Sequence, residues 1–137
     1  MITLNQYVGV HRESPDWTPS REQAATKLLA KCNSLQAEME ADGVVFPVNP
    51  KTKSQISGST FGGFRPQNCP QGSPNSSHKE GRGVDNFDPN EDIDNWCIAH
   101  VDRLKFHGIH IEHPSKTIGW SHWTDRAPPS GRQVFFP

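Results

Sequence analysis

The stretch from Gly58 to Ser77 contains no aliphatic side chain and is made largely of Gly, Pro, Ser and Asn. Such a stretch lacks the apolar periodicity that a core-facing helix or strand requires. Loops of this length within a compact domain usually carry a function or are disordered. We therefore expect a long loop here, and a core built from the residues on either side of it.

Composition limits the class of protein that can surround this loop. Only 32% of the residues are hydrophobic, and the 11 Gly and 12 Pro add to the loop content. The 14 basic and 15 acidic residues leave a net charge of −1, so we expect neither nucleic-acid binding by bulk positive charge nor disorder caused by charge repulsion. The apolar runs are too short for membrane insertion, and the N-terminus has no signal-peptide pattern. We predict one small domain over residues 1–137.

Two helices are predicted, one on each side of the loop. The first follows an extended lead-in expected over residues 1–17; it begins after the cap residue Thr18 and ends at Gly43. The second begins with a capping-box pattern at Asp88 and Glu91 and extends to Gly108. The apolar positions at helical spacing are Ala24, Ala25, Leu28, Leu29, Cys32, Leu35 and Met39 in the first helix, and Ile93, Trp96, Cys97, Val101 and Leu104 in the second.

Short alternating segments predict strands at residues 109–112 and 119–123, and the connection between them is short enough for an antiparallel hairpin. The segment Lys53–Ser59 is a further candidate strand. The Pro-rich tail over residues 124–137 ends in the apolar run Val134–Phe136, which we expect to pack on the body of the domain. The predicted fold class is therefore α+β, with two main helices packed on a small, mostly antiparallel sheet whose open face carries a metal site.

Histidine, rather than cysteine, is the residue type that indicates chemistry. The three cysteines lack a CxxC spacing and are odd in number, so neither a disulfide framework nor a cysteine-rich zinc site is expected. Cys32 and Cys97 fall on apolar helix faces, where a free cysteine usually behaves as a small buried hydrophobe. Five of the seven histidines lie between His100 and His122, and metal ligation can supplement a small core.

The segment between His78 and Asp85 can contribute two ligands to a metal site. Two residues seven positions apart cannot meet on a straight strand. Gly81 and Gly83, however, allow a turn that brings the side chains of His78 and Asp85 to one point. A catalytic zinc site has three protein ligands and one open position. His122 is the best candidate for the third ligand, and His110 on the neighbouring strand is the alternative.

The same segment carries a motif that resembles a known family. The block SxHxxGxxxD, followed by an aromatic-flanked histidine, resembles the zinc motif of D-alanyl-D-alanine carboxypeptidases and related phage L-alanyl-D-glutamate endopeptidases. The resemblance extends over roughly residues 56–122 and implies one Zn2+ ion held by His78, Asp85 and His122. The residues that match the motif are Ser76, His78, Gly81, Asp85, Trp120 and His122.

The resemblance also implies roles for residues around the metal. Phe64-Arg65, which follows Ser57-Gly58 after an insertion, resembles the family's SGYR turn, in which the arginine holds a carboxylate of the substrate. Arg65, Ser76 and Trp120 are therefore the expected substrate-binding residues, with Trp120 on the same strand face as the last histidine.

One position departs from the family pattern. The acidic general base of the family lies three residues before the last histidine, where this chain has Gly119. Glu112 is the candidate replacement, if the hairpin brings its side chain beside His122; otherwise it is expected to form an ion pair with Arg126 or Lys116. Weaker substitutes for the base are Glu80 and Asp125.

Two functions are therefore considered. The first is zinc-dependent hydrolysis of a peptide bond in the stem peptides of bacterial peptidoglycan, by a phage-encoded protein present in the host cytoplasm before lysis or in the virion. The closing residues SGRQVFFP resemble phage-encoded members of the family. The second is a virion structural protein that keeps the peptidase fold without catalysis. In that case the segment 126–132 would dock on other virion proteins.

Overall fold

The computed structural model describes all residues, 1–137, as an α+β fold with four α-helices and a four-stranded mixed sheet. The helices are α1 (Leu4–Val8), α2 (Pro19–Ala41), α3 (Asp92–Ala99) and α4 (Val101–His107). The strands are β1 (Gly83–Phe87), β2 (His110–Glu112), β3 (Trp120–Thr124) and β4 (Val134–Phe135), and short 3-10 turns lie at η1 (Gly9–His11), η2 (Ser77–Glu80) and η3 (Pro114–Lys116).

The sheet has the strand order β1-β3-β2-β4. The pairs β1/β3 and β2/β3 are antiparallel, which confirms the predicted hairpin between β2 and β3. β4 adds to the outer edge of β2 in the parallel direction. The Pro-rich tail therefore packs on the body as predicted, and it does so by extending the sheet.

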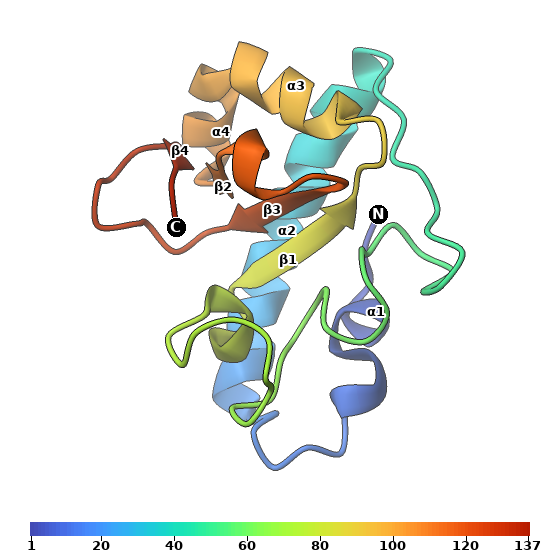
Figure 1. Cartoon of the computed structure of the whole chain (residues 1–137), viewed down its shortest axis with the longest axis vertical. Coiled ribbons are helices and arrows are strands. Elements are labelled where there is room, and N and C mark those ends of the chain that lie inside the picture. The colour runs from blue at the N-terminus through green and yellow to red at the C-terminus, as the bar shows by residue number, and fades with distance from the viewer.

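Side chains alternate between the two faces of the sheet, as the period of a strand requires. Val84, Ile111 and Trp123 are buried in the hydrophobic core, and α2 passes behind this face (Figure 1). Asp85 and His122 occupy the neighbouring positions on β1 and β3 and therefore point to the opposite face. The sheet thus separates an apolar core from a polar face.

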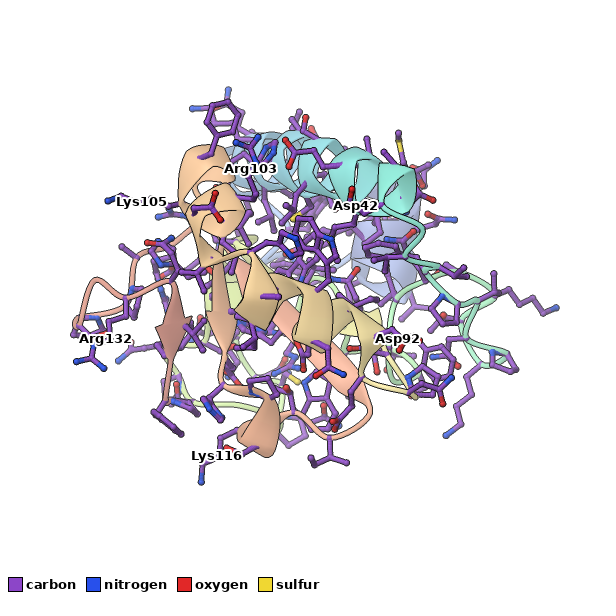
Figure 2. The ribbon with its side chains drawn as sticks, turned by 90° about the horizontal axis from the view of Figure 1, so that it is seen from above. Asp42, Asp92, Arg103, Lys105, Lys116 and Arg132 are labelled. Atoms are coloured by element: carbon purple, nitrogen blue, oxygen red, sulfur yellow. The ribbon has the colours of Figure 1, made fainter.

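Helix α2 supplies six of the 18 buried hydrophobic residues of the core, more than any other element, as its periodicity predicts. Thr18 caps it by accepting a hydrogen bond from the amide of Arg21 at 3.3 Å, and Pro19 occupies its first turn. Leu28 and Leu35 are fully buried, and each contributes about 1.5–3 kcal/mol by leaving water. Seen from above, α2 lies on one side of the strands and Lys116 projects on the other (Figure 2). None of the helices combines the length and apolar character needed to cross a bilayer.

The prediction that Cys32 and Cys97 are buried on apolar helix faces is confirmed. Cys32 and Cys97 are buried and unpaired, and Cys69 in the long loop is buried as well. Burial raises the pKa of the Cys32 and Cys97 thiols well above the usual range. Both helix cysteines therefore serve as small apolar groups in the core.

Two predictions for the N-terminal half are wrong. The first 17 residues are not extended, because Thr3 and Gln6 form a reciprocal capping box that starts α1. The segment Lys53–Ser59 forms no regular strand; it makes only the isolated bridges Asn49–Ser54 and Ile56–Asn86.

The second helix is divided in two, where one helix was predicted. The backbone of His100 leaves the helical region at φ −132°, and its ring stacks on Trp96 with the ring centroids 4.0 Å apart. Asp88 accepts hydrogen bonds from the amides of Ile93 and Asp94, whereas Glu91 adopts a left-handed conformation and makes no side-chain cap. Asp88 thus binds the first amides of α3 from outside the helix, and the predicted Asp88/Glu91 capping box does not form.

Asp94 is a buried carboxylate in the first turn of α3. One of its oxygens accepts a hydrogen bond from Thr117 at 3.1 Å, and the other has no partner. Burial, together with the nearby negative charge of Asp88, raises the pKa of Asp94 from 3.8 to about 6. The folded state therefore holds this proton more tightly than the unfolded state, so Asp94 destabilises the fold above about pH 6 and the penalty is lost below about pH 4.

The variant Asp94→Asn removes this charge and keeps an acceptor for Thr117. We expect it to raise the free energy of unfolding by about 1–3 kcal/mol at pH 7.5 and to give no gain at pH 4. Urea unfolding at the two pH values measures the difference. A gain of equal size at both pH values, or a loss at pH 7.5, would contradict this account.

Candidate metal centre

Three side chains from three elements meet on the polar face of the sheet: His78 from η2, Asp85 from β1 and His122 from β3. His78 Nε2 lies 3.1 Å from Asp85 Oδ1 and 3.2 Å from His122 Nδ1, and His122 Nδ1 lies 2.9 Å from Asp85 Oδ1. All three residues are buried, and their ligand atoms lie within 4.8 Å of one another. The structure brings together the three residues that the sequence predicts as metal ligands.

The local backbone explains how residues distant on a strand can meet. Ser76 accepts a hydrogen bond from the amide of His78 and so starts the η2 turn, and Gly81 ends that turn with φ +75°. Gly83 then begins β1, where a Cβ atom would lie only 2.3 Å from Ser77 Oγ. The sequence predicts the turn but not the strand that follows it.

The sheet register fixes the other two ligands. Asp85 and His122 are direct partners in the antiparallel β1/β3 ladder, so their side chains project side by side from the same face.

Hydrogen bonds to the backbone set the orientation of the first histidine. His78 Nδ1 lies 2.7 Å from the carbonyl oxygen of Gly63. A carbonyl only accepts, so Nδ1–H donates to it, and the lone pair of the neutral ring is on Nε2, which faces Asp85 and His122. Metal-binding histidines commonly have a partner of this kind on the other nitrogen. Nothing in the sequence pattern identifies Gly63, because the contact depends on how the long loop folds.

The electrostatics of the cluster favour an ionised Asp85 carboxylate. Burial lowers the pKa of His78, although Asp85 acts in the opposite direction. Burial alone would raise the pKa of Asp85, but the charge and hydrogen bonds of the adjacent His78 and His122 hold it well below its usual range. The ionised carboxylate is the protonation state that metal ligation requires of Asp85.

The spacing of the donor atoms fits one ion. Ligand atoms about 2.0–2.1 Å from a tetrahedral ion are about 3.3 Å apart, and the three separations here are between 2.9 and 3.2 Å. Two imidazole nitrogens and a carboxylate oxygen form a donor set that divalent transition metals accept. The cluster could therefore hold one metal ion.

Arg65 supports this cluster directly. Its Nη2 donates to Asp85 Oδ2 at 3.1 Å, and its Nε donates to the carbonyl oxygen of Phe61 at 2.7 Å. The side chain is only 11% exposed. The arginine predicted to hold a substrate carboxylate thus holds the carboxylate of a candidate ligand.

A cavity of about 800 Å³ opens beside the three ligands. The loop residues 72, 73 and 75–77 form part of its lining, and residues 126–130 and 135–137 of the tail form another part. Ser76, Trp120 and Glu112 also line it, so the structure places these three predicted site residues around one space. A smaller cavity of about 280 Å³ adjoins it and shares the residues Arg65, Asp85 and Trp120.

Glu112 lies beside His122, as the hairpin predicts. Its Oε1 is 4.0 Å from His122 Nε2, on the ring nitrogen that is not directed at Asp85. It forms no ion pair with Arg126 or Lys116, because Arg126 pairs with Glu80. Its carboxylate is therefore left facing the cavity.

The remaining candidates are held elsewhere. Asp125 forms ion pairs with Lys31 and Arg82. The alternative ligand His110 is directed at the backbone carbonyl of Arg132, at 2.9 Å, and does not belong to the cluster.

Comparison of the chain with protein families, with curated proteins and with solved structures gave no match.

Proposed function

We propose that the cluster binds one zinc ion and that the protein hydrolyses a peptide bond in peptidoglycan stem peptides, as a D-Ala-D-Ala carboxypeptidase or an L-Ala-D-Glu endopeptidase. The observation that carries this proposal is the set of three buried ligands, His78, Asp85 and His122, at the side of a cavity that is large enough for a peptide. The motif resemblance supplies the substrate class. The proposal includes a phage origin, with the protein in the host cytoplasm before lysis or in the virion.

A bound zinc ion supplies Lewis-acid chemistry, which polarises a carbonyl group and makes water more acidic. Glu112 is the base in this proposal: its carboxylate, which lines the cavity 4.0 Å from His122 Nε2, would take a proton from water and return it to the leaving amine. Trp120 and Ser76 contribute an aromatic and a hydroxyl surface against which the peptide lies. Arg65 keeps Asp85 oriented toward the other two ligands.

The test uses purified peptidoglycan and soluble stem peptides. Zinc-loaded protein should release new amino termini, chelation should abolish the release, and zinc should restore it; mass spectrometry then identifies the bond that is cut. Metal-dependent release of a single class of terminus supports the proposal. Absence of cleavage in protein shown to contain zinc would overturn it.

A second function has one observation in its favour. Gly119, at the position of the family's acidic base, has φ +92° and no side chain. A virion structural protein that keeps the metal centre without catalysis would tolerate this residue. Bound zinc in protein that cleaves none of the stem peptides is the result expected for this second function.

A further inference from the structure

We propose that Arg126 is the residue of the cavity that binds a carboxylate of the peptide, in place of Arg65. This inference rests on the proposed function, because it takes the ligand of the cavity to be an acidic peptide. It concerns a residue outside the family motif, at the end of β3.

Arg65 is poorly placed for this role. Two of the three guanidinium nitrogens of Arg65 already donate hydrogen bonds, Nε to the carbonyl oxygen of Phe61 and Nη2 to Asp85 Oδ2. Its positive charge is already paired with a carboxylate that is itself buried. A substrate carboxylate at Arg65 would compete with the candidate metal ligand for the same guanidinium group.

Arg126 has the opposite properties. It lines the same cavity, and its side chain is 37% exposed. Its Nη1 donates to the carbonyl oxygen of Asn75 at 2.7 Å and lies 3.0 Å from Glu80 Oε2. The Nε and Nη2 groups have no hydrogen-bond partner within the protein. The guanidinium group is therefore held in place through one nitrogen while two others remain available.

The charges around the cavity leave this role to Arg126. Among the charged residues of the lining, Asp85 is paired with Arg65, and Glu112 carries the negative charge assigned to the base. Arg126 is the remaining cation. A planar guanidinium binds a carboxylate through two parallel hydrogen bonds, which gives orientation as well as attraction.

The surroundings of Arg126 indicate the kind of ligand. Asn75 contacts it directly, and the cavity that they share is also lined by the polar Ser73 and by the apolar surfaces of Pro128 and Phe135. A peptide with small apolar side chains and a free carboxylate matches this combination. The carboxylate of such a peptide would lie against the tail segment that follows β3.

The experiment compares two probes: a stem peptide with free carboxyl groups and the same peptide with its carboxyl groups amidated. Binding is measured by calorimetry on metal-free protein, so that no probe is consumed, and KM is measured on zinc-loaded protein. We expect Arg126→Ala to weaken binding of the free-acid peptide about 10-fold or more, and to change binding of the amidated peptide less than about 2-fold.

Two further variants separate recognition from a structural role of Arg126. Glu80→Gln removes the ion-pair partner of Arg126 and should leave binding unchanged or strengthen it, since the guanidinium is no longer neutralised. Arg132→Ala is the matched control, because Arg132 is exposed on the turn before β4, away from the cavity lining (Figure 2). Unchanged melting temperatures show that the variants fold.

Equal weakening of both probes by Arg126→Ala, accompanied by the same loss in Glu80→Gln, would show that Arg126 only braces the loop and would overturn the inference. Wild-type protein that cleaves the peptide while Arg126→Ala binds it normally would overturn the inference and leave the proposed function intact. Wild-type protein that neither binds nor cleaves either probe would overturn both.

Discussion

Substitution of either histidine ligand, as His78→Ala or His122→Ala, is expected to lower the affinity for zinc by more than 100-fold. Removal of a residue that merely supports a ligand typically costs about 10–100-fold, and each of these residues contributes one of only three donor atoms. At a zinc concentration 100 times the dissociation constant, binding stabilises the wild-type fold by about 2.7 kcal/mol. The variants lose this stabilisation at the same concentration.

The measurement combines metal analysis after dialysis with thermal unfolding in the presence and absence of zinc. His100→Ala is the matched control, because His100 lies at the junction of α3 and α4 and belongs to no metal cluster. The control should bind zinc as the wild type does. Retention of zinc at wild-type affinity in both His78→Ala and His122→Ala would contradict the assignment of the ligands.

The second large effect is expected for the variant Glu112→Gln. This variant should bind zinc as the wild type does but hydrolyse the stem peptide much more slowly. The amide has the shape of the carboxylate but cannot accept the proton of water, and general acid–base catalysis is typically worth about 10²–10⁴-fold. We therefore expect kcat for stem-peptide hydrolysis to fall by that factor with zinc content unchanged.

Glu80→Gln serves as the comparison for this effect. Glu80 is exposed and paired with Arg126, so kcat should remain within about 2–3-fold of the wild type. Near-normal turnover in Glu112→Gln would show that Glu112 is not the base, and a loss confined to Glu80→Gln would assign that role to Glu80.

Strong periodicity made part of the fold predictable. The first long helix and the β2/β3 hairpin both follow from apolar residues at the spacing of helix or strand. Trp120 lies on the same strand face as His122, as expected, and both residues line the same cavity.

The elements that could not be predicted from the sequence lack this apolar periodicity. β1 contains the buried polar residues Asp85 and Asn86, so its sequence shows no apolar alternation. The side chain of Asn86 is satisfied by Gln55 and by the carbonyl of Ser121, which are distant in sequence. The break at His100 interrupts a pattern that continues as one amphipathic helix. In each case tertiary contacts decide the local structure.

The candidate site, like the fold, has one part that could be predicted from the sequence and another part that could not. His78 and Asp85 could be predicted as a pair from the glycine turn between them. The aromatic-flanked strand favoured His122 over His110 as the third ligand, and the motif resemblance implied the full set. The partners of these ligands, Gly63 for His78 and Arg65 for Asp85, could not. Both lie in the first half of the long loop, which approaches the N-terminal helix α1 closely, since a Cβ atom on Gly63 would lie 2.1 Å from the carbonyl oxygen of Tyr7. A close backbone contact of this kind produces no periodic pattern of residues in the sequence.

The most direct test of the metal centre is an anomalous difference map at the zinc absorption edge, from crystals of the zinc-loaded protein. The account predicts a single peak about 2.0–2.2 Å from His78 Nε2, His122 Nδ1 and a carboxylate oxygen of Asp85. A peak at other residues, or no peak among these three in protein that contains one equivalent of zinc, would contradict it.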